Sequence, residues 1–420
     1  MKKRKITSVF LALGLFASLL FQVPISAEEA DQSAAVEASG TISTNSISGW
    51  PQASDISSEA AVVMENTTNT ILYSKNADEV LFPGSTVKIM TCLLALENTQ
   101  LTDEVTMTAT GVSGVTDGGA SISSQVDEVF TVEQCLYAIM VASANDIALQ
   151  IAEHVGGSVD GFVQQMNTRA QELGCTNTVF TNPTGLPDEN QHTTAHDMAL
   201  ITKAAIDNES FRAIAETTSY TIPATNVSGG ERVLTNNFSM LNNTNASYYQ
   251  YCLGGREGYT EASGSTLVCG AEKNGVSLIA VVLQGASGTT AAEAVSLLNY
   301  GFDNFQLLSL GDNDFDMASG GNVFVPNGTT ADALTTQDGE VQDGQYNRQF
   351  LFNGTPVGTA VMSVTSPEED TAVIEASTQN LTNAQDYTVS HTSVPYFVIG
   401  GIGLLLLLLI LFRIVKVAKS

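Results

Sequence analysis

Basic residues are scarce in this chain of 420 residues. Lysine and arginine together number 16, against 44 aspartates and glutamates, so the formal net charge is −28 at pH 7. A chain this acidic is repelled by nucleic-acid phosphates and by anionic membrane surfaces, which argues against either as a partner. The acids are spread along the sequence without blocks of like charge. This distribution favours an ordinary solvated surface.

Cysteine is also rare, and the sequence has no visible internal repeat. None of the cysteine spacings is typical of a metal-binding or redox motif. We therefore expect buried free thiols, without a disulfide framework, at all five positions: Cys92, Cys135, Cys175, Cys252 and Cys269. The hydrophobic fraction of 43% is high enough to build a core, which excludes global disorder.

The N-terminus has the features of a secretory signal peptide. Residues 1–6 are positively charged, residues 9–23 are apolar, and residues 25–27 offer a small-residue cleavage site. We predict a signal peptide over residues 1–27, with an uncleaved membrane anchor as the alternative.

A second apolar run lies near the C-terminus. Residues 394–412 have about the ~20-residue length that a helix needs to cross a bilayer. Arg413, Lys416 and Lys419 follow this run, which places the tail, residues 413–420, inside the cell. We therefore predict a single-pass protein of the cell membrane, with its main part on the outer, cell-wall side.

The segments between these two runs predict an α+β domain followed by a small all-β domain. Residues 61–64 and 71–73 read as a hairpin, residues 87–96 and 133–155 as helical, and residues 265–269 and 277–283 as strands around a tight turn. Short strands are expected at residues 322–325, 348–352 and 359–364. The predicted organisation is a flexible spacer (28–49), a catalytic domain (50–308), a β domain (309–375) and a polar stalk (376–393).

Ser85 and Lys88 are the first candidates for chemistry. Pro-Gly precedes Ser85, and the i, i+3 spacing puts the hydroxyl and the amine on one face of a helix. A serine needs a base beside it to become a nucleophile, and a lysine can be that base if burial keeps it neutral. The backbone N–H of Ser85, at the start of a helix, would be free for an oxyanion. The alternative is a helix cap and a surface lysine.

Two further motifs follow along the chain. Ser143 and Asn145 interrupt an apolar helical region, where polar side chains need partners or a function. A simple turn between two helices explains them equally well. The segment Arg256-Glu257-Gly258-Tyr259 comes just before an expected strand. Its glycine would let a substrate backbone approach closely, and the N–H of Tyr259 could complete an oxyanion hole.

Ser85-x-x-Lys88, Ser143-x-Asn145 and Arg256-x-Gly258, in this order, resemble the motifs of serine β-lactamases and penicillin-binding proteins. The sequence most resembles the low-molecular-weight D-alanyl-D-alanine carboxypeptidases. The likeness covers residues 50–305 and includes longer stretches, at residues 166–174, 177–186, 192–199 and 297–302.

The resemblance implies a transpeptidase-like fold with an antiparallel sheet and a helical region. It also implies a role for each matching residue. Ser85 would be the acyl-enzyme nucleophile and Lys88 its general base; Ser143 would relay a proton to the leaving amine, and Asn145 would hold the amide carbonyl of the substrate. Arg256 stands where the family has lysine, and the N–H groups of Ser85 and Tyr259 would form the oxyanion hole.

The partners that the resemblance implies are peptidoglycan stem peptides, with β-lactams as covalent inhibitors. No metal or other cofactor is needed. His192 and His196, beside Asp197, have a spacing that could suggest zinc, but the family match makes them structural.

The sequence departs from the family at its third motif, which reads Arg256-Glu257-Gly258 in place of Lys-Thr-Gly. In the family the threonine and a nearby arginine hold the terminal carboxylate of D-alanine. This chain has an acid in place of the threonine, and no basic residue in the segment where the arginine is expected, 285–292. One hypothesis is that Glu257 pairs with Arg256 and turns away, which leaves a weak carboxypeptidase. A second is that the site prefers an endopeptidase substrate or a modified terminus, and a third is that the chain binds the cell wall without catalysis.

A β-lactamase shares the three motifs. That enzyme needs a group to activate the deacylating water, and no acid lies at the expected place after Asn182. The β domain and the membrane segment also suit a wall enzyme better.

Overall fold

The computed structural model describes residues 41–115, 119–311, 315, 321–342 and 344–363. The chain divides into two compact units, Met1–Val364 and Thr365–Ser420, and every described residue belongs to the first. The predicted signal peptide and the apolar run at 394–412 lie outside the described residues. Within the described ranges, no helix is both long enough and apolar enough to cross a membrane.

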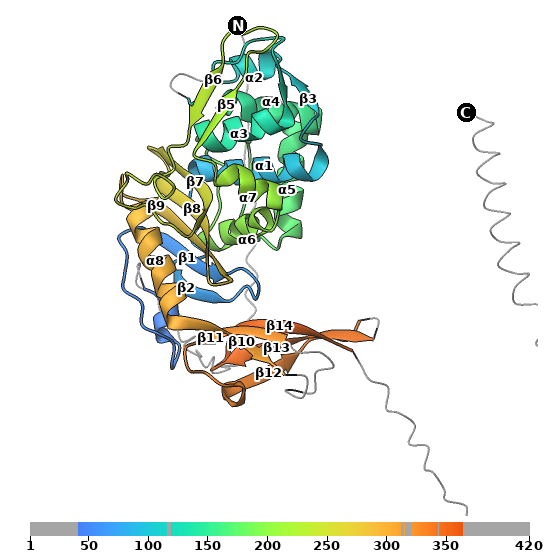
Figure 1. The fold of residues 1–420 in the computed structure, drawn as a ribbon. Helices are drawn as coiled ribbons and strands as arrows, with labels where there is room; N and C mark the ends of the chain where they lie inside the picture. The colour runs from blue at the N-terminus through green and yellow to red at the C-terminus, as the bar shows by residue number, and fades with distance from the viewer. Residues whose placement is uncertain (1–40, 116–118, 312–314, 316–320, 343, 364–420) are drawn as a thin grey trace, which may run out of the picture. The chain divides into compact units, whose positions relative to one another are not determined.

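A five-stranded antiparallel sheet forms the centre of the structure, with the order β2-β1-β9-β8-β7 (Figure 1). The predicted hairpins at 61–73 and 265–283 are confirmed as β1–β2 and β8–β9. The strands are β1 (Ala60–Glu65), β2 (Ile71–Lys75), β7 (Cys252–Thr260), β8 (Gly264–Lys273) and β9 (Val276–Gly285).

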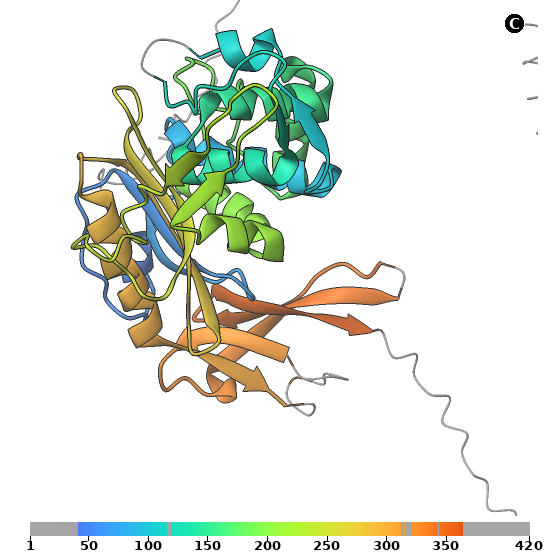
Figure 2. The same ribbon diagram turned by 45° about the horizontal axis from the view of Figure 1, so that its top comes forward.

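Both faces of this sheet are buried, because its inner strands are apolar at nearly every position. Val62, Ile279 and Val281 face a core shared with a large group of helices. Their neighbours Val63 and Ala280 face a second core, which lies under α8 (Thr290–Asn304). Figures 1 and 2 show α8 on one side of the sheet and the helical group on the other. The architecture is thus α+β, as the sequence predicts.

The helical group lies between β2 and β7 in the sequence. The predicted helix at 87–96 is confirmed as α1, and the predicted helical region at 133–155 consists of α3 and α4, separated by Ser143 and Ala144. The helices are η2 (Gly84–Val87), α1 (Lys88–Asn98), α2 (Ala109–Ser113), α3 (Val132–Ala142), α4 (Asn145–Gly156), α5 (Val159–Glu172), α6 (Ala195–Ile206) and α7 (Glu209–Ala215). Two small hairpins complete the group: β3 (Glu104–Thr106) with β4 (Val129–Thr131), and β5 (Ser219–Ile222) with β6 (Arg232–Thr235).

Short strands follow α8, as the composition predicts. All three predicted strands are present, as β11, β13 and β14, together with two strands that were not expected from the sequence. The elements are β10 (Phe305–Leu310), β11 (Gly321–Pro326), η4 (Ala331–Ala333), β12 (Leu334–Asp338), β13 (Gln345–Phe352) and β14 (Thr355–Ser363). They pair as β10-β11 and β12-β13-β14.

Residues 41–49, which composition assigns to the flexible spacer, pack against the rest of the unit. They include η1 (Ser43–Ser46), and Ile42 is buried in the core under α8. Trp50 follows, donates from its indole N–H to the Leu72 carbonyl, and has its ring centroid 5.0 Å from that of Phe305. Residues 41–49 thus pack against the domain through Ile42, an apolar residue inside a polar stretch.

Phe324 on β11 tests how far this core stabilises the protein. Its ring is fully buried and stacks on Phe305, which in turn contacts Trp50. Phe324→Ala should lower the free energy of unfolding by about 3–5 kcal/mol, because it leaves a cavity. Urea denaturation followed by the fluorescence of Trp50, the only tryptophan in the chain, measures this loss.

Val361 on β14 supplies the control because it is 65% exposed. Val361→Thr keeps a β-branched side chain and should change the stability by less than about 0.5 kcal/mol. Equal effects of the two substitutions would contradict the described core.

Candidate active site

Ser85 and Lys88 lie on one face of a short helical turn, as the sequence predicts. Ser85 belongs to the 3-10 turn η2, and Lys88 is the first residue of α1. The Lys88 Nζ atom is 3.5 Å from the Ser85 Oγ atom. Among the described residues, the backbone N–H of Ser85 has no hydrogen-bond acceptor. Ser85 thus combines a nearby amine with a free backbone donor.

Lys88 is shielded from water. Its exposed fraction is 1%, and its amine donates a hydrogen bond to the Thr184 carbonyl. Burial, together with the positive charge of Arg256, holds the pKa of Lys88 well below that of an exposed lysine. A neutral amine of this kind has a lone pair that can accept a proton from the adjacent hydroxyl.

Arg256 connects the sheet to the helical group. Its Nη1 atom donates to the Met140 carbonyl at 2.6 Å, in the last turn of α3 and three residues before Ser143. Burial lowers the pKa of Arg256 to about 10, so the guanidinium still carries its charge at neutral pH. Unlike the lysine of the family motif, it therefore acts as a fixed cation near Lys88.

Ser143 and Asn145 occupy the junction of α3 and α4. Ser143 ends α3 in the left-handed conformation, with φ of 57°. Asn145 is buried at the start of α4, and its backbone N–H donates to the Ala120 carbonyl at 2.8 Å. Its side-chain oxygen has no partner among the described residues, and neither does the Arg256 Nε atom. The two residues lie near each other in the fold, because the Arg256 guanidinium contacts the last turn of α3, just before the α3–α4 junction that contains Asn145.

The strand β7 passes directly against Ser85. A Cβ atom added to Gly258 would lie 2.7 Å from the Ser85 Cβ atom, so this close approach requires a glycine. The motif comes just before the strand β8, as expected, and Arg256, Glu257, Gly258 and Tyr259 themselves lie inside β7. Because β7 is an edge strand of the sheet, one of its sides is open to a substrate backbone.

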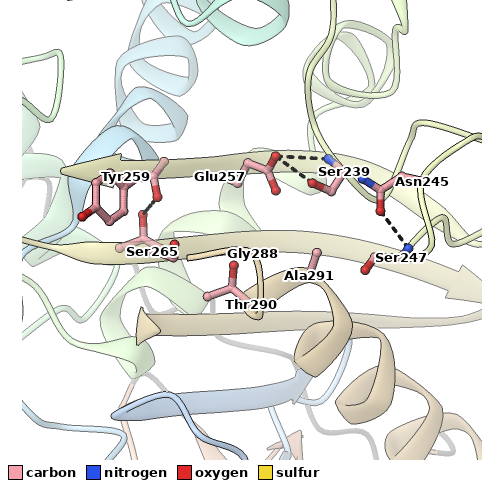
Figure 3. A pocket seen from close by; sticks show the side chains of 11 residues that line it. Ser239, Asn245, Ser247, Glu257, Tyr259, Ser265, Gly288, Thr290 and Ala291 are labelled. Atoms are coloured by element: carbon pink, nitrogen blue, oxygen red, sulfur yellow. Dashed lines mark hydrogen bonds between the residues drawn. The ribbon is translucent and has the colours of Figure 1, made fainter. Parts of the chain in front are cut away.

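Glu257 points to the opposite face of β7 from Arg256, because side chains alternate along a strand. The hypothesis that the two form a pair is wrong: their side chains make no ion pair within the described ranges, and each has other partners. The Glu257 Oε1 atom accepts hydrogen bonds from the backbone N–H of Ser239 at 3.2 Å and from its hydroxyl at 2.9 Å (Figure 3). Burial raises the pKa of Glu257, although these bonds oppose the effect.

Glu257 and Gly258 line a cavity of about 330 Å³. Figure 3 shows Glu257 in its wall. The walls are otherwise uncharged, with no lysine or arginine among the described residues that form them: Ser239, Asn245, Ser247, Gly258, Tyr259, Ser265, Thr266, Gly288, Thr290 and Ala291. Gly288 and Thr290 come from the segment in which the sequence lacks a basic residue. Two like charges 4 Å apart repel by about 4 kcal/mol at an effective dielectric constant of 20, so an ionised Glu257 disfavours a carboxylate here.

The histidines lie apart from this site. His192 hydrogen-bonds to the Asn190 carbonyl, and His196 is 3.4 Å from the Asp78 carboxylate. Asp197 accepts hydrogen bonds from the backbone of Thr176 and Asn177. The five cysteines are free, and all are buried except the half-buried Cys252.

Several residues that contribute to the site were not identified from the sequence. The Thr184 and Met140 carbonyls hold Lys88 and Arg256 through backbone atoms, which leave no mark in a motif. Ser239 lies in a loop between β6 and β7 with no signal of its own. Thr184 belongs to the segment 177–186, and the family likeness of that segment is the signal that could have found it.

The fold and this juxtaposition of serine, lysine and a glycine-containing edge strand define the class of penicillin-binding DD-peptidases. The structure is similar to that of penicillin-binding protein 6B from Escherichia coli, with a TM-score of 0.62 at 22% identity over 76% of this chain and 98% of that one. It is also similar to a D-alanyl-D-alanine carboxypeptidase from Mycobacterium tuberculosis, with a TM-score of 0.56 at 27% identity over 61% of this chain and 95% of that one.

A family model described as D-alanyl-D-alanine carboxypeptidase matches residues 48–287. The chain belongs to this family. A D-alanyl-D-alanine carboxypeptidase of Bacillus subtilis is 34% identical over 257 residues, which are 59% of this chain and 63% of that protein. The similarity therefore spans under two thirds of the length of that relative.

Gly258→Ala tests the close approach of β7 to Ser85. The added methyl group would collide with Ser85, and forcing extra volume into a packed site costs about 1–3 kcal/mol of stability. Gly229→Ala is the matched control, because a Cβ atom there meets nothing within 4 Å. Urea unfolding should separate the two variants, whereas equal stabilities would show that β7 does not touch Ser85.

Proposed function

We propose that this protein is a serine-type D-alanyl-D-alanine carboxypeptidase that acts on peptidoglycan stem peptides through an acyl-enzyme. The observation that supports this most strongly is the buried Lys88 amine, 3.5 Å from the Ser85 hydroxyl. Hydrogen bonds in a site without its substrate are often long and tighten when the substrate binds, so this distance suits a general base.

In the first half of the reaction, Ser85 Oγ attacks the carbonyl carbon of the penultimate D-alanine, and its proton moves to Lys88 Nζ. The backbone N–H groups of Ser85 and Tyr259 stabilise the resulting oxyanion. The tetrahedral intermediate collapses as the peptide C–N bond breaks. Ser143 gives its proton to the leaving amine and is reprotonated from Lys88, so D-alanine departs and an ester on Ser85 remains.

In the second half, water attacks this ester and gives up a proton, which reaches Ser85 Oγ through Lys88 as the C–O bond breaks. One water molecule is consumed and the free enzyme is restored. Asn145 holds the amide of the bound stem throughout, supported by its buried and unpartnered side-chain oxygen. Burial, reinforced by the fixed charge of Arg256, lowers the pKa of Lys88 and so keeps its amine neutral between cycles.

A DD-endopeptidase of the same fold, or a protein that binds the wall without catalysis, is the alternative. The close contact of Ser85 with Lys88 favours the enzyme over a binding protein. We further propose that the catalytic unit works on the cell-wall side of the cytoplasmic membrane, held there by the apolar run at 394–412.

A fluorescent penicillin tests the acyl-enzyme, since β-lactams acylate serines activated in this way. The full chain should form a stable adduct on Ser85, detected by intact mass and by the mass of the labelled peptide. Ser85→Ala should lose the adduct entirely.

Glu257→Thr is the companion variant, because an acid beside the drug's own carboxylate slows its binding. This variant should label faster than the unaltered chain. Rapid release of the adduct would indicate a β-lactamase, and absence of labelling in both chains would leave only a wall-binding protein.

A further inference from the structure

The cavity beside Gly258 has an acceptor that no described part of the protein satisfies. Both hydrogen bonds from Ser239 reach the same oxygen of Glu257, Oε1. The second oxygen, Oε2, has no donor among the described residues, and Glu257 is the only charged side chain that they contribute to the cavity lining. Figure 3 shows Glu257 across the cavity from Thr290 and Ala291.

The cavity lies next to the reacting serine. Gly258 contacts Ser85 and follows Glu257 directly in β7. Both Gly258 and Glu257 line the cavity. A stem peptide whose scissile carbonyl sits at Ser85, with its backbone along the open edge of β7, would place its end here. The group at that end must therefore be compatible with the free oxygen of Glu257.

We propose that this cavity binds a terminal group that donates N–H hydrogen bonds, so that the preferred stem ends in a carboxamide and not in a free carboxylate. This inference rests on the proposed DD-peptidase function and specifies its substrate class. The leaving group would be D-alaninamide in place of D-alanine. The stem must then come from a reaction that amidates its terminal carboxyl group.

A carboxamide matches Glu257 in either protonation state. The ionised carboxylate accepts from the amide N–H₂, while the protonated acid can also donate to the amide C=O. A substrate carboxylate matches only the protonated acid. Burial raises the pKa of Glu257 and the two donors from Ser239 oppose this rise, so a ligand that suits both protonation states fits the site best.

The test compares two acylated D-Ala-D-Ala peptides that differ only at the C-terminus, one a carboxylate and one a carboxamide. Binding is measured by calorimetry on the full chain carrying Ser85→Ala, which cannot turn the peptides over. The carboxamide should bind at least about tenfold more tightly. Glu257→Gln, added to the same chain, should reverse this ratio because its amide can donate to the carboxylate.

Glu261→Gln provides the matched control. Glu261 is an exposed acid just after β7 and does not line the cavity, so removing its charge should leave the ratio unchanged. Equal or tighter binding of the carboxylate by the Ser85→Ala chain would overturn the inference. The inference is also overturned if Glu257→Gln leaves the ratio of the two peptide affinities unchanged.

A second experiment tests the catalytic proposal independently of the binding preference. Both peptides are incubated with the chain that retains Ser85, and the products are identified by mass. Release of D-alaninamide supports both proposals. A chain that shows the binding preference but releases no product and forms no penicillin adduct is not a peptidase, and the cavity assignment then stands alone.

Discussion

The site depends on keeping one lysine amine out of water. An exposed lysine is protonated at neutral pH and cannot accept a proton, whereas Lys88 is buried and its amine donates to the Thr184 carbonyl. Burying a group that water would solvate well lowers the stability of the fold. The result is an amine held beside a hydroxyl, as the proposed general base requires.

The surrounding fold serves this arrangement. The turn η2 and the start of α1 fix the spacing of Ser85 and Lys88, β7 approaches Ser85 through Gly258, and Arg256 joins β7 to the end of α3. The apolar strands β1, β8 and β9 hold β7 at the sheet edge. Without this packing the amine would be hydrated and the serine would be an ordinary helix-start residue.

Much of this could be predicted from the sequence. Periodicity identified α1 and both hairpins, and the i, i+3 spacing of Ser85 and Lys88 correctly placed their side chains together. The contacts made by backbone atoms, such as the Thr184 carbonyl, could not be predicted, since any residue can supply a carbonyl. The orientation of Glu257 could be predicted only with the bounds of β7 in hand. Side chains alternate along a strand, and this alternation separates Glu257 from Arg256.

The third motif shows how one substitution can change the chemistry of a pocket without changing the fold. Glu257 occupies a normal strand position, and Ser239 satisfies one of its oxygens. Gly258, the next residue along β7, approaches Ser85, while the Glu257 side chain contacts Ser239. In the proposed mechanism, the residue that recognises the end of the substrate and the residue that reacts with it therefore lie on opposite faces of one strand.

The protonation state of Lys88 tests the central claim most directly. Nitrogen NMR of the lysine side chains in the full chain, with the Lys88 signal assigned by its loss in Lys88→Arg, reports the charge of each amine. The account predicts a neutral Lys88 amine at neutral pH, while exposed lysines remain ammonium groups. A Lys88 signal that stays that of an ammonium ion up to the pH at which exposed lysines titrate would contradict it.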